Sequence, residues 1–183
     1  MTFFSDCDHA AWVERLIGII LASTLVLGCF WVRASYQHVT KRVSFHPAKN
    51  AAAELSALSN SRSHATVILA MQIGCHWCEN SAGYYHVLMA KYSQRGVHFT
   101  VVMPQAVDQQ TSFLTSLSLP VSDVRQVSFT KLSIVGTPTV FVLNDNAHVL
   151  GAWEGLLNID GETKIESCLD RALAPTRSDQ DCE

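Results

Sequence analysis

Two cysteines separated by two residues, Cys75 and Cys78, have a spacing suited to redox chemistry. Cysteines at this spacing can close a small disulfide ring without disturbing the backbone around them. The preceding segment, Val67–Met71, has the composition of a strand, and Asn80 to about Arg95 has that of a helix. A thiol at the start of a helix is favoured as thiolate, because the macrodipole and the free backbone N–H groups stabilise negative charge. The spacing therefore indicates a thiol–disulfide redox centre.

The position of each residue relative to the helix predicts its role in such a centre. Cys75 is nearer the helix start and is predicted to attack, whereas Cys78 would resolve the mixed disulfide from one turn further in. His76 lies beside both, and its positive form would stabilise the thiolate and make the pair more oxidising. Trp77 is predicted to be exposed and to offer a docking surface for a partner protein. The alternatives are a plain stabilising disulfide or half of a zinc site, with His76 and Trp77 as surface residues without a role.

The composition excludes several other classes of protein. The 183 residues include 13 Lys and Arg against 16 Asp and Glu, and no basic stripe suggests nucleic acid as a partner. A structural zinc site needs four ligands, and the chain has no second C-x-x-C, so we predict no metal. The other four cysteines are Cys7, Cys29, Cys168 and Cys182, and we predict that they are ordinary thiols or form one incidental disulfide. Cys168 is predicted to pack in the core, and Cys182 to be an idle thiol on a frayed tail.

An uncharged apolar run, Leu16 to Val32, predicts one membrane-spanning helix near the N-terminus. Trp12 and Trp31 lie near its ends, where interfacial aromatic residues are expected, and Arg15 and Arg33 lie just outside. The predicted organisation is an N-terminal tail (1–15), a transmembrane helix (16–33), a tether (34–50), a folded domain (51–175) and a flexible tail (176–183).

Two alternatives concern this membrane segment. Val26–Cys29 loosely resembles a lipoprotein processing site with Cys29 as the lipid-bearing residue, although Leu27 is not the usual small residue. The orientation is also open, because the basic residues after the segment favour a cytoplasmic domain by the positive-inside rule. A tethered dithiol domain, however, makes most sense facing an oxidising compartment. We therefore expect the domain on the extracytoplasmic, periplasmic side of the inner membrane.

The folded part has the element order of an α/β protein. A central mixed β-sheet with helices on both faces is predicted from two βα crossovers followed by a hairpin. The predicted strands are Thr66–Met71, Val97–Met103, Val124–Val127, Thr139–Leu143 and His148–Trp153. The predicted helices are Ala51–Leu58, Asn80 to about Arg95, Asp108–Leu117 capped by Asp108, Phe129–Ile134 and Ile159–Leu173.

Two separated motifs make Ala65 to Leu173 resemble the thioredoxin-like superfamily. One is Cys75-His76-Trp77-Cys78 opening a helix, and the other is Val135-Gly136-Thr137-Pro138-Thr139 leading into a strand. The resemblance implies a thioredoxin-like fold in which Pro138 is cis and lies beside the cysteine pair. It also implies that the Thr137 backbone binds the chain around a substrate cysteine, as an added strand would.

The N-terminal anchor and the helical insertion before the Gly-Thr-Pro segment resemble the membrane-anchored TlpA-like group. This resemblance implies a thiol–disulfide oxidoreductase acting on protein cysteines, with a redox partner and no cofactor. The sequence departs from thioredoxin itself in its His-Trp dipeptide and in Leu69, which stands where thioredoxins carry a buried acid. The direction of electron flow stays open.

Two other functions fit parts of the same pattern. A peroxiredoxin-like peroxidase usually has Thr or Ser three residues before its reactive cysteine, where this chain has Gln72. A membrane-tethered copper chaperone would use Cys75, Cys78 and a His, although related folds typically place three residues between the cysteines.

Overall fold

The structure is a computed structural model that describes residues 49–174 without a gap, together with 41–42, 182 and four positions near the N-terminus, 18, 23, 24 and 28. The chain divides into two units, 1–39 and 40–183. In the first unit the four described positions are helical. No helix formed by described residues is long and apolar enough to cross a membrane. The predicted N-terminal tail, most of the predicted transmembrane helix, and both Cys7 and Cys29 lie outside the described residues.

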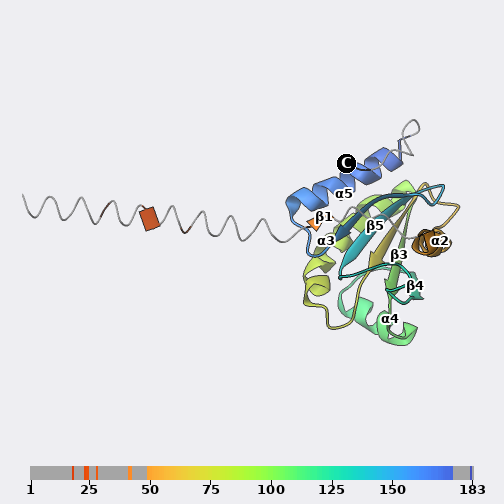
Figure 1. Cartoon of the computed structure of the whole chain (residues 1–183), viewed down its shortest axis with the longest axis horizontal. Helices are drawn as coiled ribbons and strands as arrows, with labels where there is room; N and C mark the ends of the chain where they lie inside the picture. The colour runs from red at the N-terminus through yellow and green to blue at the C-terminus, as the bar shows by residue number, and fades with distance from the viewer. Residues whose placement is uncertain are drawn as a thin grey trace, which may run out of the picture. The chain divides into compact units, whose positions relative to one another are not determined.

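The second unit is built on one mixed sheet of six strands in the order β1-β6-β5-β2-β3-β4 (Figure 1). Strands β2, β3 and β4 are parallel to one another, whereas β5, β6 and β1 follow in antiparallel pairs. The predicted mixed α/β sheet is therefore confirmed. The bounds of the strands are β1 Lys41–Arg42, β2 Ala65–Ala70, β3 Val97–Met103, β4 Asp123–Gln126, β5 Thr139–Asn144 and β6 Val149–Glu154.

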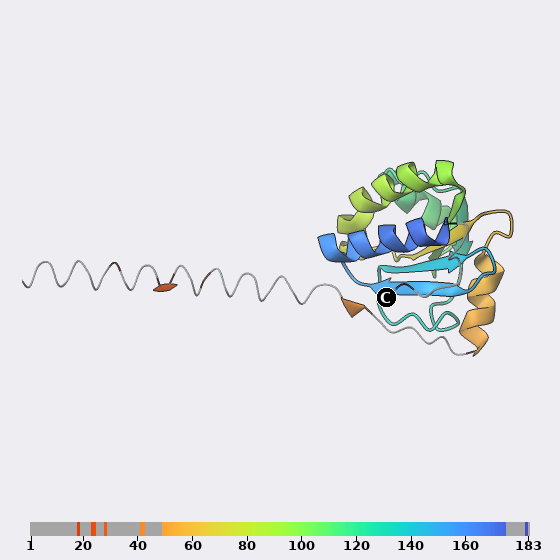
Figure 2. The same ribbon diagram turned by 90° about the horizontal axis from the view of Figure 1, so that it is seen from above.

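Helices cover both faces of this sheet (Figure 2). Helices α3, α4 and α5 pack on one face, where their apolar side chains share a core cluster with β2, β3 and β5. Helix α2 covers the other face, with Leu55 and Leu58 against the opposite side of the same strands. The bounds are α2 Lys49–Leu58, α3 His76–Tyr92, a 3-10 turn Ser93–Arg95, α4 Val107–Ser116 and α5 Ile159–Ala172.

Strand β2 lies at the centre of the sheet and contributes side chains to the core clusters on both of its faces. Val67 and Leu69 point into the cluster under α3, whereas Ile68 and Ala70 point toward α2. Successive side chains of a strand face opposite sides, so a strand covered on both faces needs an unbroken apolar run. The predicted burial of Thr66–Met71 on both faces is confirmed, since every residue of β2 is buried.

Two predicted helical features are wrong. Helix α4 starts at Val107 after Ala106, so Asp108 lies inside its first turn and is not its cap. Residues 129–134 form successive turns rather than a helix, and Ser133 has a φ of +55°. That left-handed conformation interrupts helical hydrogen bonding. Phe129 and Ile134 nevertheless pack against the α2 face of the sheet. The apolar residues of this segment therefore contribute to the core without forming a helix.

A second disulfide, Cys168–Cys182, joins α5 to the C-terminal end of the chain. Cys182 is buried, and its backbone N–H donates to the carbonyl oxygen of Leu150 in β6, with N and O 2.7 Å apart. The prediction of an idle thiol on a frayed tail is therefore wrong for Cys182, whereas the alternative of one disulfide among the four scattered cysteines is confirmed. Cys168 is packed in the core as predicted, but as half of this disulfide rather than as a free thiol.

The edge strand β4 is attached to β3 by a polar cluster around Asp123. Its carboxylate accepts hydrogen bonds from His98 (2.9 Å), Thr100 (2.9 Å) and Arg125 (2.7 Å). Burial alone would raise the pKa of Asp123, but the hydrogen bonds from Arg125, His98 and Thr100 outweigh it and lower the pKa to about 2. The charged carboxylate therefore stabilises this edge of the sheet.

Replacing Asp123 by asparagine is expected to lower the free energy of unfolding at neutral pH by about 1–2 kcal/mol. Because the folded-state pKa of Asp123 is depressed, its contribution is complete above the ordinary value of 3.8 and is lost as the pH falls toward about 2. Urea unfolding at both ends of this range measures the difference. Asp145→Asn, an exposed carboxylate in the β5–β6 turn, is the control. A loss for Asp123→Asn that persists undiminished at pH 2 would contradict the assignment.

Candidate redox site

The predicted cysteine pair lies at the N-terminus of α3. The helix begins at His76, four residues before the predicted start, and Cys75 is its N-cap residue. The Cys75 Sγ accepts a hydrogen bond from the Cys78 backbone N–H, with N and Sγ 3.1 Å apart. An N-cap normally offers a side-chain oxygen to these free N–H groups. Here sulfur takes that place, and the same N–H groups favour a thiolate when the pair is reduced.

Cys75 and Cys78 are joined by a disulfide, and their Cα atoms are 5.2 Å apart. The two sulfur atoms differ sharply in environment. Cys75 is half-buried, whereas Cys78 is 0% exposed and belongs to the core cluster under α3. Only one side of this disulfide can therefore meet another protein.

The loop between β2 and α3 gives Cys75 its position. Gly74 has a φ of +79°, a left-handed conformation that favours glycine, and the backbone N–H of Cys75 donates to the Gln72 carbonyl oxygen at 3.2 Å. Strand β2 ends at Ala70, so this tight turn delivers Cys75 at the carboxyl end of the central strand. The left-handed conformation at this position accounts for the glycine, Gly74, directly before Cys75.

The second motif meets the first at this end of the sheet. The Thr137–Pro138 peptide bond is cis, as the resemblance implies, and β5 begins immediately afterwards with Thr139 opposite Ala70 of β2. The Thr137 carbonyl oxygen lies 3.5 Å from the Cys75 Sγ, and the Thr137 hydroxyl donates to the same sulfur at 3.4 Å. The structure thus brings together two segments 62 residues apart in the sequence.

His76 and Trp77 lie on the outside of the first turn of α3. Both are exposed, Trp77 by 49%, and their ring centroids are 5.3 Å apart. The Asn80 side-chain nitrogen lies 3.1 Å from the His76 Nε2 and donates to it, because an amide nitrogen has no acceptor site. Asn80 one turn along the helix was not predicted as a neighbour of the site, although its i, i+4 spacing from His76 is the signal for it.

The interior below Cys78 is apolar. Leu69 is fully buried in the same cluster as Cys78. An aliphatic side chain therefore lies at the position where the resemblance to thioredoxin would place a buried acid. Ser81, also buried, donates its hydroxyl to the Trp77 carbonyl oxygen at 2.8 Å. Burial raises the pKa of Tyr85, which lies two turns along the same helix face, so its hydroxyl stays protonated. The buried residues of the described chain carry no charged side chain, and Glu79, which follows Cys78, is exposed.

Two exposed apolar residues beside the site were not predicted. Ile73 is 36% exposed in the turn before Cys75, and Val135 is 93% exposed two residues before Thr137. With Trp77 they are three of six large hydrophobic side chains exposed in the described part of the chain. An exposed apolar group near a reactive centre suggests contact with a partner. The described residues contain no group of three or more His, Cys, Asp or Glu that could hold a metal ion.

A scan against protein-family models and a search of curated proteins found no match to the sequence. Solved structures do match. A putative thiol:disulfide interchange protein DsbE from Chlorobium tepidum has a TM-score of 0.53 at 21% identity, covering 64% of this chain and 85% of that one. A putative thioredoxin from Neisseria meningitidis has a TM-score of 0.55 at 12% identity, with coverages of 65% and 81%. A thiol:disulfide interchange protein from Bacteroides sp. has a TM-score of 0.51 at 10% identity, with coverages of 65% and 80%.

At these identities the likeness concerns the fold. The chain has a thioredoxin-like α/β fold, which the sequence motifs predicted, with a close disulfide pair at the start of α3. The fold is the one that these thiol:disulfide interchange proteins use.

Proposed function

We propose that this protein is a membrane-anchored thiol–disulfide oxidoreductase that exchanges disulfides with protein cysteines through Cys75 and Cys78. The observation that carries the proposal is the asymmetry of the pair, since Cys75 is half-buried at a helix N-terminus and Cys78 is fully buried behind it. A stabilising disulfide needs no such difference, whereas stepwise exchange needs one reachable sulfur and one protected sulfur.

In the reducing direction the proposed reaction has two steps. The Cys75 thiolate attacks one sulfur of a substrate disulfide, the substrate S–S bond breaks, and the other substrate sulfur leaves as a thiolate that takes a proton. Cys78, having lost its proton to solvent, then attacks the Cys75 Sγ and releases the second substrate thiolate. Two electrons pass to the substrate, and the Cys75–Cys78 disulfide remains. The oxidising direction is the reverse.

Thr137 and Pro138 are proposed to hold the substrate chain during this exchange. The Thr137 carbonyl oxygen lies 3.5 Å from the Cys75 Sγ, and Thr137 itself is only half-buried. A substrate backbone paired there would place its own cysteine next to Cys75, as an added strand pairs at a sheet edge. The proposed partners are protein substrates and a separate redox protein that restores the starting state of the pair.

His76 is proposed to raise the reduction potential of the pair by stabilising the thiolate of the reduced form. We expect His76→Ala to lower that potential by about 30 mV, which corresponds to about 1.4 kcal/mol for two electrons. Equilibration with glutathione buffers of graded ratio measures the potential. His86→Ala, on an exposed position of the same helix, is the control. An unchanged potential in His76→Ala would assign His76 to the surface only.

The proposed location is the inner membrane with the folded domain on the extracytoplasmic side, in the manner of TlpA-like proteins. The apolar run at 16–32 supports the anchor. The buried Cys168–Cys182 disulfide supports the side of the membrane, because structural disulfides persist mainly in oxidising compartments. A C-terminal alkaline phosphatase fusion tests this location, since the enzyme folds only outside the cytoplasm. An inactive, full-length fusion would reverse the proposed orientation.

The proposed activity is tested with the full chain in a mild non-ionic detergent. The reduced protein is expected to reduce insulin disulfides with dithiothreitol as electron source, or the oxidised protein to oxidise a reduced peptide, depending on the potential of the pair. Protein alkylated with iodoacetamide while reduced is the control, because the accessible Cys75 thiol is blocked. If the unmodified chain exchanges disulfides in neither assay above the alkylated control, the oxidoreductase proposal fails.

A further inference from the structure

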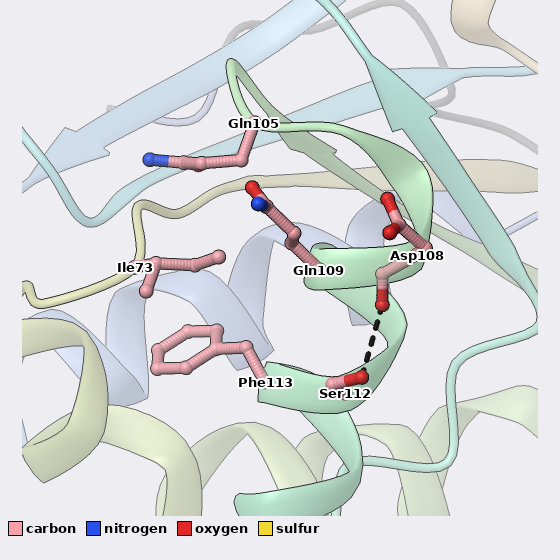
Figure 3. A pocket seen from close by; sticks show the side chains of 6 residues that line it. All are labelled: Ile73, Gln105, Asp108, Gln109, Ser112 and Phe113. Atoms are coloured by element: carbon pink, nitrogen blue, oxygen red, sulfur yellow. Dashed lines mark hydrogen bonds between the residues drawn. The ribbon is translucent and has the colours of Figure 1, made fainter.

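A groove of about 650 Å³ opens between the turn that precedes Cys75 and the first turns of α4 (Figure 3). This volume falls within the range of ligand-binding pockets. The residues that line it come from the β2–α3 turn, from the β3–α4 turn and from one side of α4: Ile73, Gln105, Asp108, Gln109, Ser112 and Phe113.

The order of the strands places this groove next to the redox pair. Strand β2 lies between β5 and β3, with β3 parallel and β5 antiparallel to it. Thr137 before β5, Cys75 after β2 and Gln105 after β3 therefore lie at the same end of the sheet. Cys75 has the Thr137 carbonyl on one side and the groove on the other. Ile73 belongs both to the wall of the groove and to the turn that carries Cys75.

The walls of the groove combine apolar and amide groups. Ile73 and Phe113 extend toward each other from opposite sides, and the Gln109 side chain extends over the same space (Figure 3). Phe113 is half-buried and packs against the main core, which holds its side chain in place. Asp108 is the one charged side chain among the lining residues. These features favour an uncharged, apolar group over an acidic one.

The β3–α4 turn behind the groove is held by a buried amide. Gln110 is 0% exposed, and its Nε2 donates to the carbonyl oxygens of Met103 (3.2 Å) and Gln105. The groove is therefore formed in the free protein. Gln105 lines it, and the Gln105 Oε1 is buried without a hydrogen-bond partner in the described part of the chain. A buried unpaired acceptor of this kind is costly, and rotation of the Gln105 amide toward the groove would let an N–H group of a ligand pair with its oxygen.

On the basis of the proposed function, we infer that this groove receives an apolar side chain of the polypeptide substrate, about three residues from the cysteine that Cys75 attacks. Neighbouring strands lie about 4.8 Å apart, so the distance from β5 to β3 is about 10 Å. An extended chain covers that distance in about three residues. A substrate paired on Thr137 with its cysteine at Cys75 thus reaches the groove with the residues beyond it, and its backbone N–H groups can meet the Gln105 amide.

The test uses two short peptides, each with one cysteine and each supplied as its disulfide-linked dimer. One carries leucine at the third position on both sides of the cysteine, and the other carries glycine there. The reduced chain, in detergent, converts each dimer into two peptide thiols while Cys75 and Cys78 become a disulfide, so two electrons and two protons pass to the peptide. Glutathione disulfide serves as a substrate too small to reach the groove, and each peptide rate is divided by the glutathione rate of the same variant.

The unaltered chain is expected to prefer the leucine peptide over the glycine peptide by about tenfold in the second-order rate constant of this single turnover. Gln109→Trp, which fills the groove from an exposed position, is expected to reduce this preference to about one. Thr111→Trp is the matched control, because it places the same side chain on an exposed position of α4 outside the groove and should keep the preference. Phe113→Ala, which widens the groove, should also weaken the preference.

The outcomes separate the two proposals. If the unaltered chain reacts with glutathione disulfide but does not distinguish the peptides, or if Gln109→Trp keeps the preference, the groove is not a substrate site and the oxidoreductase proposal stands. If neither the peptide dimers nor glutathione disulfide reacts with the reduced chain, and the oxidised chain converts none of the corresponding thiols into disulfides, both proposals are overturned. An equal loss of preference in Gln109→Trp and Thr111→Trp would also contradict a role of the groove.

Discussion

Replacing Cys78 by serine is expected to stop the reaction at a covalent complex between Cys75 and the substrate. Cys75 keeps its half-buried, reachable sulfur and its N-cap position, so the first attack on a substrate disulfide is still expected. The second attack needs the buried Cys78 sulfur, and serine cannot supply it. Turnover should fall to background, while mixed disulfides accumulate and persist on non-reducing gels.

Cys75→Ser provides the matched comparison. This variant keeps a thiol at position 78, but that thiol is 0% exposed and cannot reach a substrate. Turnover should again be at background, and no mixed disulfide should form. Expressed in cells, Cys78→Ser would also capture natural partners for identification by mass spectrometry. Equal amounts of trapped complex in the two variants would show that burial does not decide which cysteine attacks.

Removing the second disulfide is expected to cost the folded domain a large part of its stability. Cys168 and Cys182 are 14 residues apart, and closing a loop of this length is worth about 3 kcal/mol in the chain-entropy account. The double variant Cys168→Ala, Cys182→Ala should lose about this amount of unfolding free energy, because the unfolded chain gains the freedom that the bond removed. Urea unfolding of the oxidised proteins measures the difference.

Reductant supplies the control for this experiment. In excess dithiothreitol neither protein has a disulfide, so the difference in unfolding free energy should largely disappear. Thiol exchange by Cys75 and Cys78 at temperatures well below unfolding should be unaffected, because the second bond lies at α5 and not at the start of α3. If the oxidised double variant were as stable as the unaltered chain, the Cys168–Cys182 bond would have no structural role.

Local sequence patterns predicted most of the fold. Strand β3 has the predicted bounds, and β2, β5 and β6 begin and end within a residue of them, because unbroken apolar runs between turn residues are typical of strands buried on both faces. Helix α5 also matches, since its apolar residues recur with helical spacing. The short segment 129–134 forms turns and not the predicted helix, because a short apolar segment does not distinguish consecutive turns from a single turn of helix.

The features that the sequence did not predict depend on contacts between distant residues. The sequence left one incidental disulfide open among the four scattered cysteines, but nothing near Cys182 indicates that Cys168 is its partner. The groove beside Cys75 needs the end of β3 and the end of β2 to be neighbours, which only the strand order determines. The start of α3 was placed too late because cysteine is not among the usual N-cap residues.

If the chain is anchored as proposed, strand β1 shortens the segment that could link the folded domain to the membrane. Lys41 and Arg42 lie within the predicted tether, 34–50, yet they pair with Glu154 and Trp153 of β6. With the membrane helix predicted to end at residue 33, residues 34–40 are the part of the predicted tether that precedes β1. Seven residues extend to at most about 25 Å, compared with about 60 Å for the whole predicted tether. On the proposed function and anchor, the partners would be proteins whose cysteines lie close to the bilayer surface, such as membrane proteins and other anchored domains.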